Sequence, residues 1–154
     1  MRALTSICVA TLLTAAVVTG DTTDNTVWDG VYTEAQAKQG SDVYFDHCAE
    51  CHADDLSGQS EYKPARPLAG PEFRSRWDGT TLDQLFWFAS TRMPKNRPGA
   101  LKKEEYAAVV AFILQANRFP ASTAKLPSDL ESLRQLRFLK ERAAKALSEG
   151  GRSN

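Results

Sequence analysis

Cysteine, histidine and methionine are scarce in this chain, and their scarcity limits the sites that it can build. The 154 residues include three cysteines, two histidines and two methionines. Neither sign of charge dominates, because nineteen Lys and Arg residues balance nineteen Asp and Glu residues. Such a balance does not favour binding to nucleic acid or to a membrane surface. The length is that of one domain with a small appendage.

The first twenty residues differ in composition from the rest of the chain. A positive charge at Arg2 precedes an apolar run over residues 3–18, and small residues follow up to Gly20. This pattern is typical of a secretory signal peptide cleaved near Gly20, and cleavage there also removes Cys8. The alternative is a membrane anchor, but the run is short and is interrupted by Thr and Ser. We therefore expect an exported, periplasmic protein without stable membrane insertion after cleavage.

Apolar periodicity predicts an all-α fold, since no stretch alternates in the manner of a strand. We predict three helices, over residues 33–48, 80–90 and 102–118. A long loop rich in Pro and Gly is expected over residues 53–79. Thr33 and Gln36 have the spacing of a capping box at the start of the first helix. Gly40, inside that helix, indicates close approach of another helix, because glycine is otherwise unfavourable there.

A change of composition after Pro120 predicts an added C-terminal amphipathic helix. Ser128 and Glu131 have capping-box spacing, and Gly150 and Gly151 supply a stop signal. Apolar residues share one arc of the helical wheel, namely Leu133, Leu136, Leu139, Ala143 and Leu147. The predicted organisation is a signal peptide over 1–20, a flexible leader over 21–32, a main domain over 33–122 and a helical extension over 123–154.

Two of the three cysteines and both histidines gather in the segment HCAECH. Within it, Cys48, Cys51 and His52 form a C-x-x-C-H motif, the attachment signal for c-type haem. The spacing suits the chemistry, because two thiols add to the two vinyl groups of the porphyrin and the adjoining imidazole coordinates the iron. A thioredoxin-like dithiol needs a β-α-β context, which is missing. A structural zinc site needs four ligands, which the chain without its signal peptide does not readily supply.

We therefore predict one covalently bound haem c, with Cys48 and Cys51 as thioether links and His52 as the proximal iron ligand. His47 directly precedes Cys48 and belongs to the same side of the porphyrin, so we interpret it as a partly exposed histidine at a helix end. Met93 is the one methionine left after signal cleavage, and it lies in a proline-flanked loop. Although a lone methionine is usually core filler, we predict it as the distal ligand. Ligation by Met and His favours electron transfer over oxygen chemistry.

The order of these motifs between residues 30 and 122 resembles that of class I c-type cytochromes. More narrowly, it is similar to the cytochrome modules that accompany periplasmic quinoprotein (pyrroloquinoline quinone) dehydrogenases. The similar segments are GVYTEAQAKQG, HCAECHADDLSG, PLAGPEFRSRWDGTTLDQLF, MPKNRPGAL and ILQANRFPAS. The resemblance implies a class I cytochrome c fold for the domain over 33–122. The extra helix after Ala124 lies outside the family pattern.

The resemblance also implies roles for residues outside the haem motif. The first and last helices of the family cross near a glycine and aromatic residues, which correspond here to Gly40, Tyr44, Val109 and Phe112. The family's tryptophan often bonds a haem propionate, and Trp77 stands at the matching place; ordinary packing is the alternative for this residue. Arg74 and Arg76 are further candidates for propionate contacts, or else ordinary exposed arginines.

The favoured function is one-electron transfer between a dehydrogenase, such as a quinoprotein, and an acceptor such as a terminal oxidase, with no catalysis by the chain itself. One alternative is a haem-based sensor in which a small ligand displaces Met93. Another is a haem subunit of a redox enzyme complex, held there by the C-terminal helix. That helix either packs across the haem domain or docks on a dehydrogenase or oxidase through a basic face.

Overall fold

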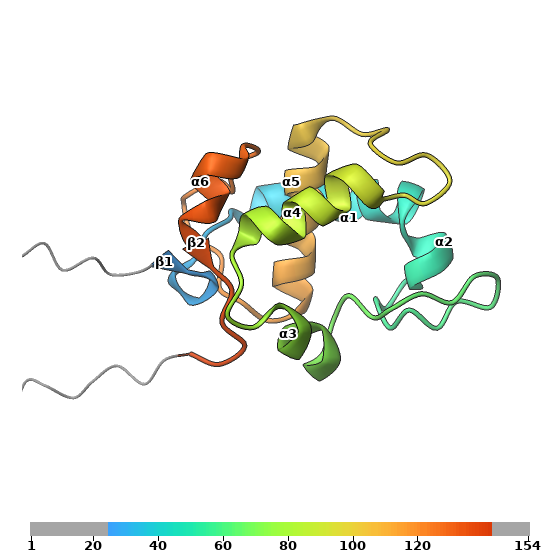
Figure 1. Ribbon diagram of the computed structural model, residues 1–154, viewed down its shortest axis with the longest axis horizontal. Helices are drawn as coiled ribbons and strands as arrows, with labels where there is room; N and C mark the ends of the chain where they lie inside the picture. Colours follow the sequence, from blue (N-terminus) through green and yellow to red (C-terminus); the bar gives the residue numbers. More distant parts are fainter. Residues whose placement is uncertain (1–24, 143–154) are drawn as a thin grey trace, which may run out of the picture.

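The computed structural model describes residues 25–142 and has a mostly helical fold, as predicted (Figure 1). The predicted signal peptide with Cys8, and the positions of Ala143 and Leu147, lie outside these residues. The elements in chain order are β1 (Asn25–Thr26), the 3-10 helix η1 (Val27–Asp29), α1 (Glu34–His47), α2 (Ala49–His52), α3 (Pro71–Trp77), α4 (Leu82–Arg92), α5 (Lys103–Ala116), α6 (Leu130–Arg134) and β2 (Leu136–Arg137). Strands of two residues are too short to give a detectable alternation.

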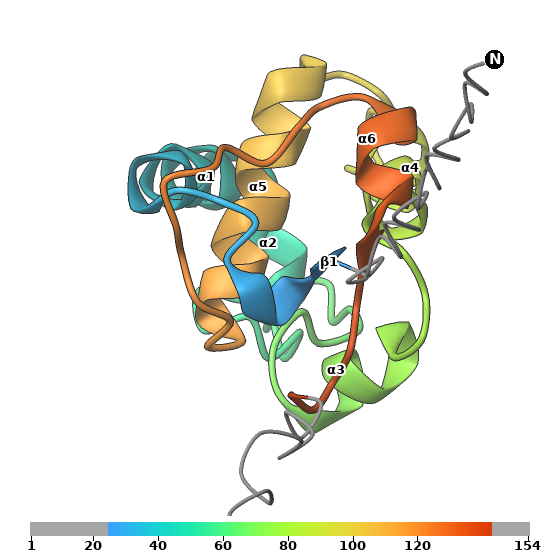
Figure 2. The same cartoon turned by 90° about the vertical axis from the view of Figure 1, so that its left-hand side faces the viewer.

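The centre of the fold is a crossing of α1 and α5, which the two views in Figures 1 and 2 show from different sides. Gly40 lies at the crossing, where a Cβ atom would come within 1.8 Å of the carbonyl oxygen of Ala108. The rings of Tyr44 and Phe112 meet beside it, with centroids 5.2 Å apart. The predicted reason for Gly40 is therefore confirmed, and so is the crossing that the resemblance implied.

The helix ends agree with the sequence in some places and differ in others. The Thr33 hydroxyl accepts a hydrogen bond from the backbone N–H of Gln36 (3.1 Å), as expected for an N-cap. The second half of the predicted capping box is wrong, because the Gln36 side chain bonds the backbone of Leu126 instead. A short helix, α3, interrupts the predicted loop over 53–79, and Pro71 stands in its first turn, where a missing N–H costs nothing.

The segment predicted as a flexible leader is packed against the domain over residues 25–32. Val27 and Tyr32 are fully buried, and the Tyr32 hydroxyl donates a hydrogen bond to the carbonyl of Phe119 (2.6 Å). The Trp28 ring meets that of Phe119 edge-on, with centroids 4.7 Å apart. The leader prediction is thus wrong for these residues. Burial of the apolar side chains of Val27, Trp28 and Tyr32 holds the segment on the domain, although the residues around them are polar and turn-rich.

The C-terminal helix is much shorter than predicted. It begins after Asp129, whose carboxylate caps it in place of Ser128, and it ends at Arg134. Leu136 and Arg137 then form β2, which runs parallel to β1. The reason lies in Phe138, which is fully buried like Leu133. Phe138 lies five positions after Leu133, so one helix would turn the two side chains to different faces, whereas an extended segment after α6 buries both.

Among residues 25–142, no helix combines the length and the apolar character needed to cross a bilayer.

Candidate haem site

The C-x-x-C-H motif forms the junction between α1 and α2. Cys48 ends α1, since its backbone N–H donates to the carbonyl of Tyr44 (2.8 Å). Its own carbonyl accepts the N–H groups of Cys51 (3.1 Å) and His52 (2.9 Å) and so starts the single turn of α2. Both cysteines are free thiols. The turn therefore holds the two sulfur atoms and the imidazole on one short, hydrogen-bonded stretch of backbone.

The imidazole of His52 is oriented by the loop that follows it. Its Nδ1 lies 2.9 Å from the carbonyl oxygen of Arg66. A carbonyl oxygen accepts only, so Nδ1 carries the proton and Nε2 keeps a free lone pair. A backbone carbonyl that accepts the other ring N–H in this way is typical of metal-ligating histidines. Burial lowers the pKa of His52, against the opposing effect of the Arg66 hydrogen bond, and so favours the neutral imidazole that binds metals.

Burial also affects the first thiol. It raises the pKa of Cys48 to about 11, and the neighbouring Cys51 adds to the shift. Cys48 is therefore a neutral thiol at neutral pH, and not a thiolate that oxidises readily.

The loop over residues 53–70 folds back on the motif through backbone hydrogen bonds. Gly58 donates its N–H to the carbonyl of His52 (2.8 Å), and Ala65 donates to the carbonyl of Gly58 (2.8 Å). Gly58 has a positive φ of 74°, and a Cβ atom there would come within 2.2 Å of Ala65 O. Tyr44 holds the other side, since its hydroxyl donates to the carbonyl of Ala53 (2.6 Å). These bonds bring the carbonyl of Arg66 to the His52 ring.

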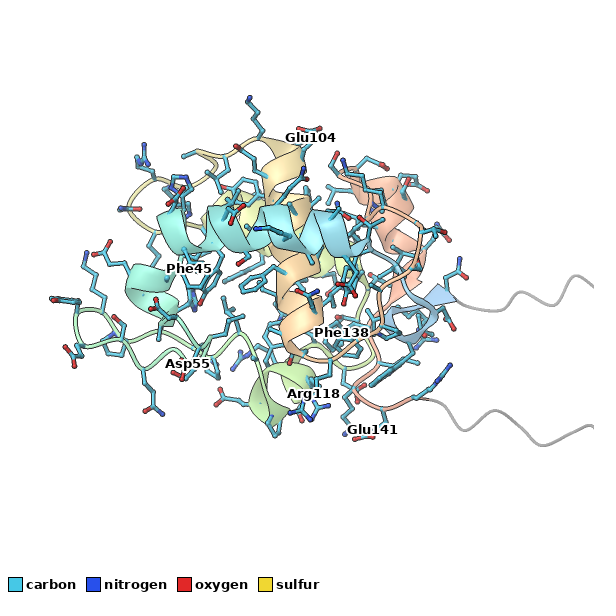
Figure 3. The ribbon with its side chains drawn as sticks, turned by 180° about the vertical axis from the view of Figure 1, so that it is seen from behind. Phe45, Asp55, Glu104, Arg118, Phe138 and Glu141 are labelled. Atoms are coloured by element: carbon cyan, nitrogen blue, oxygen red, sulfur yellow. The ribbon has the colours of Figure 1, made fainter. Side chains whose placement is uncertain are left out.

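Met93 directly follows α4, and its backbone is fixed on both sides. Its N–H donates to the carbonyl of Ala89 (3.1 Å), and its carbonyl accepts the hydroxyl of Tyr106 from α5 (2.6 Å). The loop that follows Met93 lies at the same end of the molecule as α2 (Figures 1 and 3). The charge of Lys95 in this loop contributes to the lowered pKa of His52. The fold thus brings the two predicted axial ligands to one end.

Trp77 ends α3 and is half-buried between two rings. Its ring lies 6.4 Å from that of Phe73 and 6.3 Å from that of Phe88 on α4, centroid to centroid. Within residues 25–142 the indole N–H donates no hydrogen bond. Arg76 is exposed and pairs with Glu72 (3.6 Å), which agrees with the ordinary-surface alternative for this arginine. The indole N–H of Trp77 is therefore a free hydrogen-bond donor, and its ring packs against those of Phe73 and Phe88.

A model of the family described as "Cytochrome C oxidase, cbb3-type, subunit III" matches residues 35–113, about half of the chain. The chain belongs to this family. The cytochrome is thus a haem electron-transfer protein of the class I c type.

Among solved structures, it is similar to one titled "Crystal Structure of the Sulfane Dehydrogenase SoxCD from Paracoccus pantotrophus", with 19% identity and a TM-score of 0.45. That match covers 72% of this chain and 61% of the other. Comparison with curated proteins gave no match.

The residues of the α1–α2 junction fit haem c, the group of this family. The fit rests on the donor set of the structure: two free thiols in one turn, and an imidazole with Nδ1 engaged and Nε2 available. His47, the other histidine of the motif segment, is the last residue of α1 and is half-buried.

Asn117 is a residue of the cytochrome that the sequence analysis did not identify. It lies just after α5 and is 4% exposed, and its side chain makes three hydrogen bonds. Its Oδ1 accepts from the N–H of Gly70 (3.0 Å), and its Nδ2 donates to the carbonyls of Leu68 (2.9 Å) and Ile113 (2.8 Å). Asn117 therefore ties the end of the haem-motif loop to α5. Its position at the end of a strongly periodic helix was the one available signal, and that position alone suggests only a cap.

Proposed function

We propose that this cytochrome carries one haem c, attached through Cys48 and Cys51, and transfers single electrons with His52 and Met93 as axial ligands. The observation that supports this most directly is the hydrogen bond from His52 to the carbonyl of Arg66. It leaves Nε2 as the free nitrogen of an imidazole that follows Cys51 directly in the same turn. When bound, haem c supplies an iron that takes up and releases one electron.

The chain's own residues then have distinct tasks. Cys48 and Cys51 anchor the group covalently, so that an exported protein does not lose it by dilution. The Arg66 carbonyl orients the His52 ring and raises the basicity of its Nε2. Tyr106 fixes the backbone of Met93 by a partly buried hydrogen bond of 2.6 Å. A distal ligand with a fixed backbone favours the electron carrier over the small-ligand sensor, because a sensor needs a ligand that leaves easily.

We further propose that the protein works in the periplasm, after cleavage of its signal peptide near Gly20. A dehydrogenase, such as a quinoprotein, is the proposed donor, and a terminal oxidase is the proposed acceptor. The likeness of residues 30–122 to modules that accompany quinoprotein dehydrogenases supports the donor, and the oxidase subunit family supports the acceptor. N-terminal sequencing of protein from a periplasmic extract tests the cleavage and the compartment.

The decisive experiment is acid-acetone extraction of the purified protein, followed by a reduced pyridine spectrum and iron analysis. We expect one iron per chain, the haem retained in the protein pellet, and a spectrum of a porphyrin with both vinyl groups saturated. Haem that moves into the acetone phase would contradict covalent attachment. The sensor alternative is tested on the same sample with carbon monoxide, which an electron carrier with both axial positions filled does not bind readily.

A further inference from the structure

The C-terminal strap, residues 136–140, contacts the connection between α3 and α4. Gly79 donates its backbone N–H to the carbonyl of Phe138 (2.9 Å), and Phe138 donates its own to the carbonyl of Thr80 (2.9 Å). Arg137 forms a backbone bridge with Thr81. In Figure 2 the strap descends from α6 past β1 toward α3. The strap therefore adds a backbone ladder to the connection between α3 and α4.

A side-chain contact continues this ladder to the first residue of the connection. The Asp78 carboxylate accepts a hydrogen bond from the backbone N–H of Lys140 (2.9 Å) and forms an ion pair with its Nζ (3.6 Å). Asp78 directly follows Trp77, the last residue of α3, and is the C-cap of that helix. The carbonyl of Trp77 accepts both the N–H (3.1 Å) and the hydroxyl (2.7 Å) of Thr80. The backbone of Trp77 is thus bound to the residues that the strap holds.

Packing connects the strap to the same tryptophan by a second route. The buried ring of Phe138 meets that of Phe73 edge-on at 5.9 Å and that of Phe119 at 5.1 Å, centroid to centroid. Phe73 in turn contacts Trp77, which contacts Phe88 of α4. Figure 3 labels Phe138 in the interior of the molecule. An aromatic row therefore runs from the strap to α4, the helix that Met93 directly follows.

We propose that the C-terminal strap is a positioning element of the haem site, which fixes Trp77 and the start of α4 through Asp78 and Phe138. This rests on the proposed function, because it assigns the free indole N–H of Trp77 to a haem propionate. Loss of the strap bonds lets Trp77 move away from its anionic partner and admits water. Both effects favour the ferric state, so the reduction potential falls.

The strap is suited to this task and unsuited to docking on a partner. Phe138 is fully buried, and the carbonyl of Leu139 accepts the indole N–H of Trp28 (2.8 Å). The apolar side chain of Phe138 and this backbone carbonyl are therefore already used inside the domain. This favours the packing alternative for residues 136–140 over the docking one.

The experiment compares Asp78→Ala with Lys140→Ala in the haem-loaded protein. Asp78→Ala removes the hydrogen bond and the ion pair, whereas Lys140→Ala removes only the ion pair, which is half-exposed and weak. We expect a lower reduction potential and a several-fold higher affinity for imidazole in Asp78→Ala, and wild-type values in Lys140→Ala. A role in stability alone would lower the melting temperature of Asp78→Ala and leave its potential unchanged.

A double-mutant cycle makes the test specific to Trp77. If Asp78 acts through Trp77, the potential shifts of Asp78→Ala and Trp77→Phe are not additive, and the double variant resembles Trp77→Phe. Additive shifts, or a wild-type potential in Asp78→Ala with haem fully attached, would overturn the proposal. Failure of all variants and the wild type to bind haem covalently would instead contradict the proposed function. Deletion of residues 136–154, compared with deletion of 143–154, repeats the test on the whole strap.

Discussion

The side-chain amide of Gln36 binds both backbone polar groups of Leu126. Its Nε2 donates to the carbonyl of Leu126 (2.9 Å), and its Oε1 accepts the N–H of the same residue (2.8 Å). Both residues are 2% exposed. The pair joins the first turns of α1 to a segment that lies beyond the family's motif pattern. A buried amide with this geometry replaces the strand partner that Leu126 lacks.

Replacement of Gln36 by leucine is expected to destabilise the fold. The change leaves the N–H and the C=O of Leu126 buried without partners, at about 1–3 kcal/mol for each unsatisfied group. The midpoint of chemical denaturation should fall, and the haem spectrum of the folded protein should not change. Gln39→Leu on the exposed side of the same helix is the matched control. Equal stability of the two variants would show that Leu126 finds other partners.

The helices could be predicted from the sequence because their apolar faces are long and regular. Tyr106, Val109, Val110 and Ile113 repeat at helical spacing, and all four are buried in α5. The C-terminal segment could not be predicted in the same way. Its apolar arc favours a continuous helix, and only the tertiary environment of Phe138 decides that the chain extends after Arg134. Local periodicity carries no information about that environment.

The candidate site was largely predictable because its chemistry depends on residue identity and spacing. Cys48, Cys51 and His52 are adjacent in the sequence, so their proximity needs no knowledge of the fold. The groups that orient these three residues could not be predicted from the sequence. The Arg66 bond to His52 uses a backbone carbonyl, which any residue supplies, so no side-chain pattern reveals it. Asn117 and Asp78 likewise act through backbone groups of distant segments.

Gly40→Ala is expected to disrupt the crossing of α1 and α5. Alanine is favoured over glycine inside a helix by about 1 kcal/mol. Here the added Cβ would lie 1.8 Å from the Ala108 carbonyl oxygen, and backbone cannot move aside as a flexible side chain does. Overpacking costs typically about 1–3 kcal/mol, so the steric effect outweighs the helix preference. Thermal melting should therefore show a lower midpoint, whereas the exposed Lys38→Ala should melt like the wild type.

Single alanine variants of Cys48 and Cys51 are expected to lose one thioether link each. Each product should show a pyridine spectrum shifted toward that of a porphyrin with one remaining vinyl group, or a low yield of haem-loaded protein. Ala49→Ser, between the two cysteines, keeps both thiols and is the control. Normal spectra and full covalent attachment in both cysteine variants would contradict the assignment of Cys48 and Cys51.

Met93→Ala is expected to lower the reduction potential and to open the iron to added ligands. Removal of the thioether takes away the ligand that stabilises the ferrous state. Carbon monoxide titration of the reduced variant measures the opening. Tyr106→Phe removes only the hydrogen bond to the Met93 carbonyl, so it should keep the ligand and bind carbon monoxide more weakly than Met93→Ala. A wild-type protein that already binds carbon monoxide as tightly as the variant would favour the sensor function.

The loop around Met93 is expected to control reaction with charged redox partners. Residues 92–103 contain no acidic side chain, and their five basic residues are exposed: Arg92, Lys95, Arg97, Lys102 and Lys103. None of the ion pairs seen within residues 25–142 involves them. A basic field beside the site attracts anions and repels cations, over about 30 Å at 0.01 M salt and about 10 Å at 0.1 M.

Reversal of two of these charges tests the field without knowledge of the natural partner. The double variant Lys95→Glu with Arg97→Glu should react more slowly with ferricyanide, an anion, and faster with a cationic cobalt complex. Stopped-flow rates should converge with those of the wild type as salt is added, because screening removes the field. The control, Lys38→Glu with Lys125→Glu, changes the net charge equally at exposed positions on α1 and after Ala124. Equal effects of the two double variants would mean that net charge, and not the loop beside Met93, sets the rate.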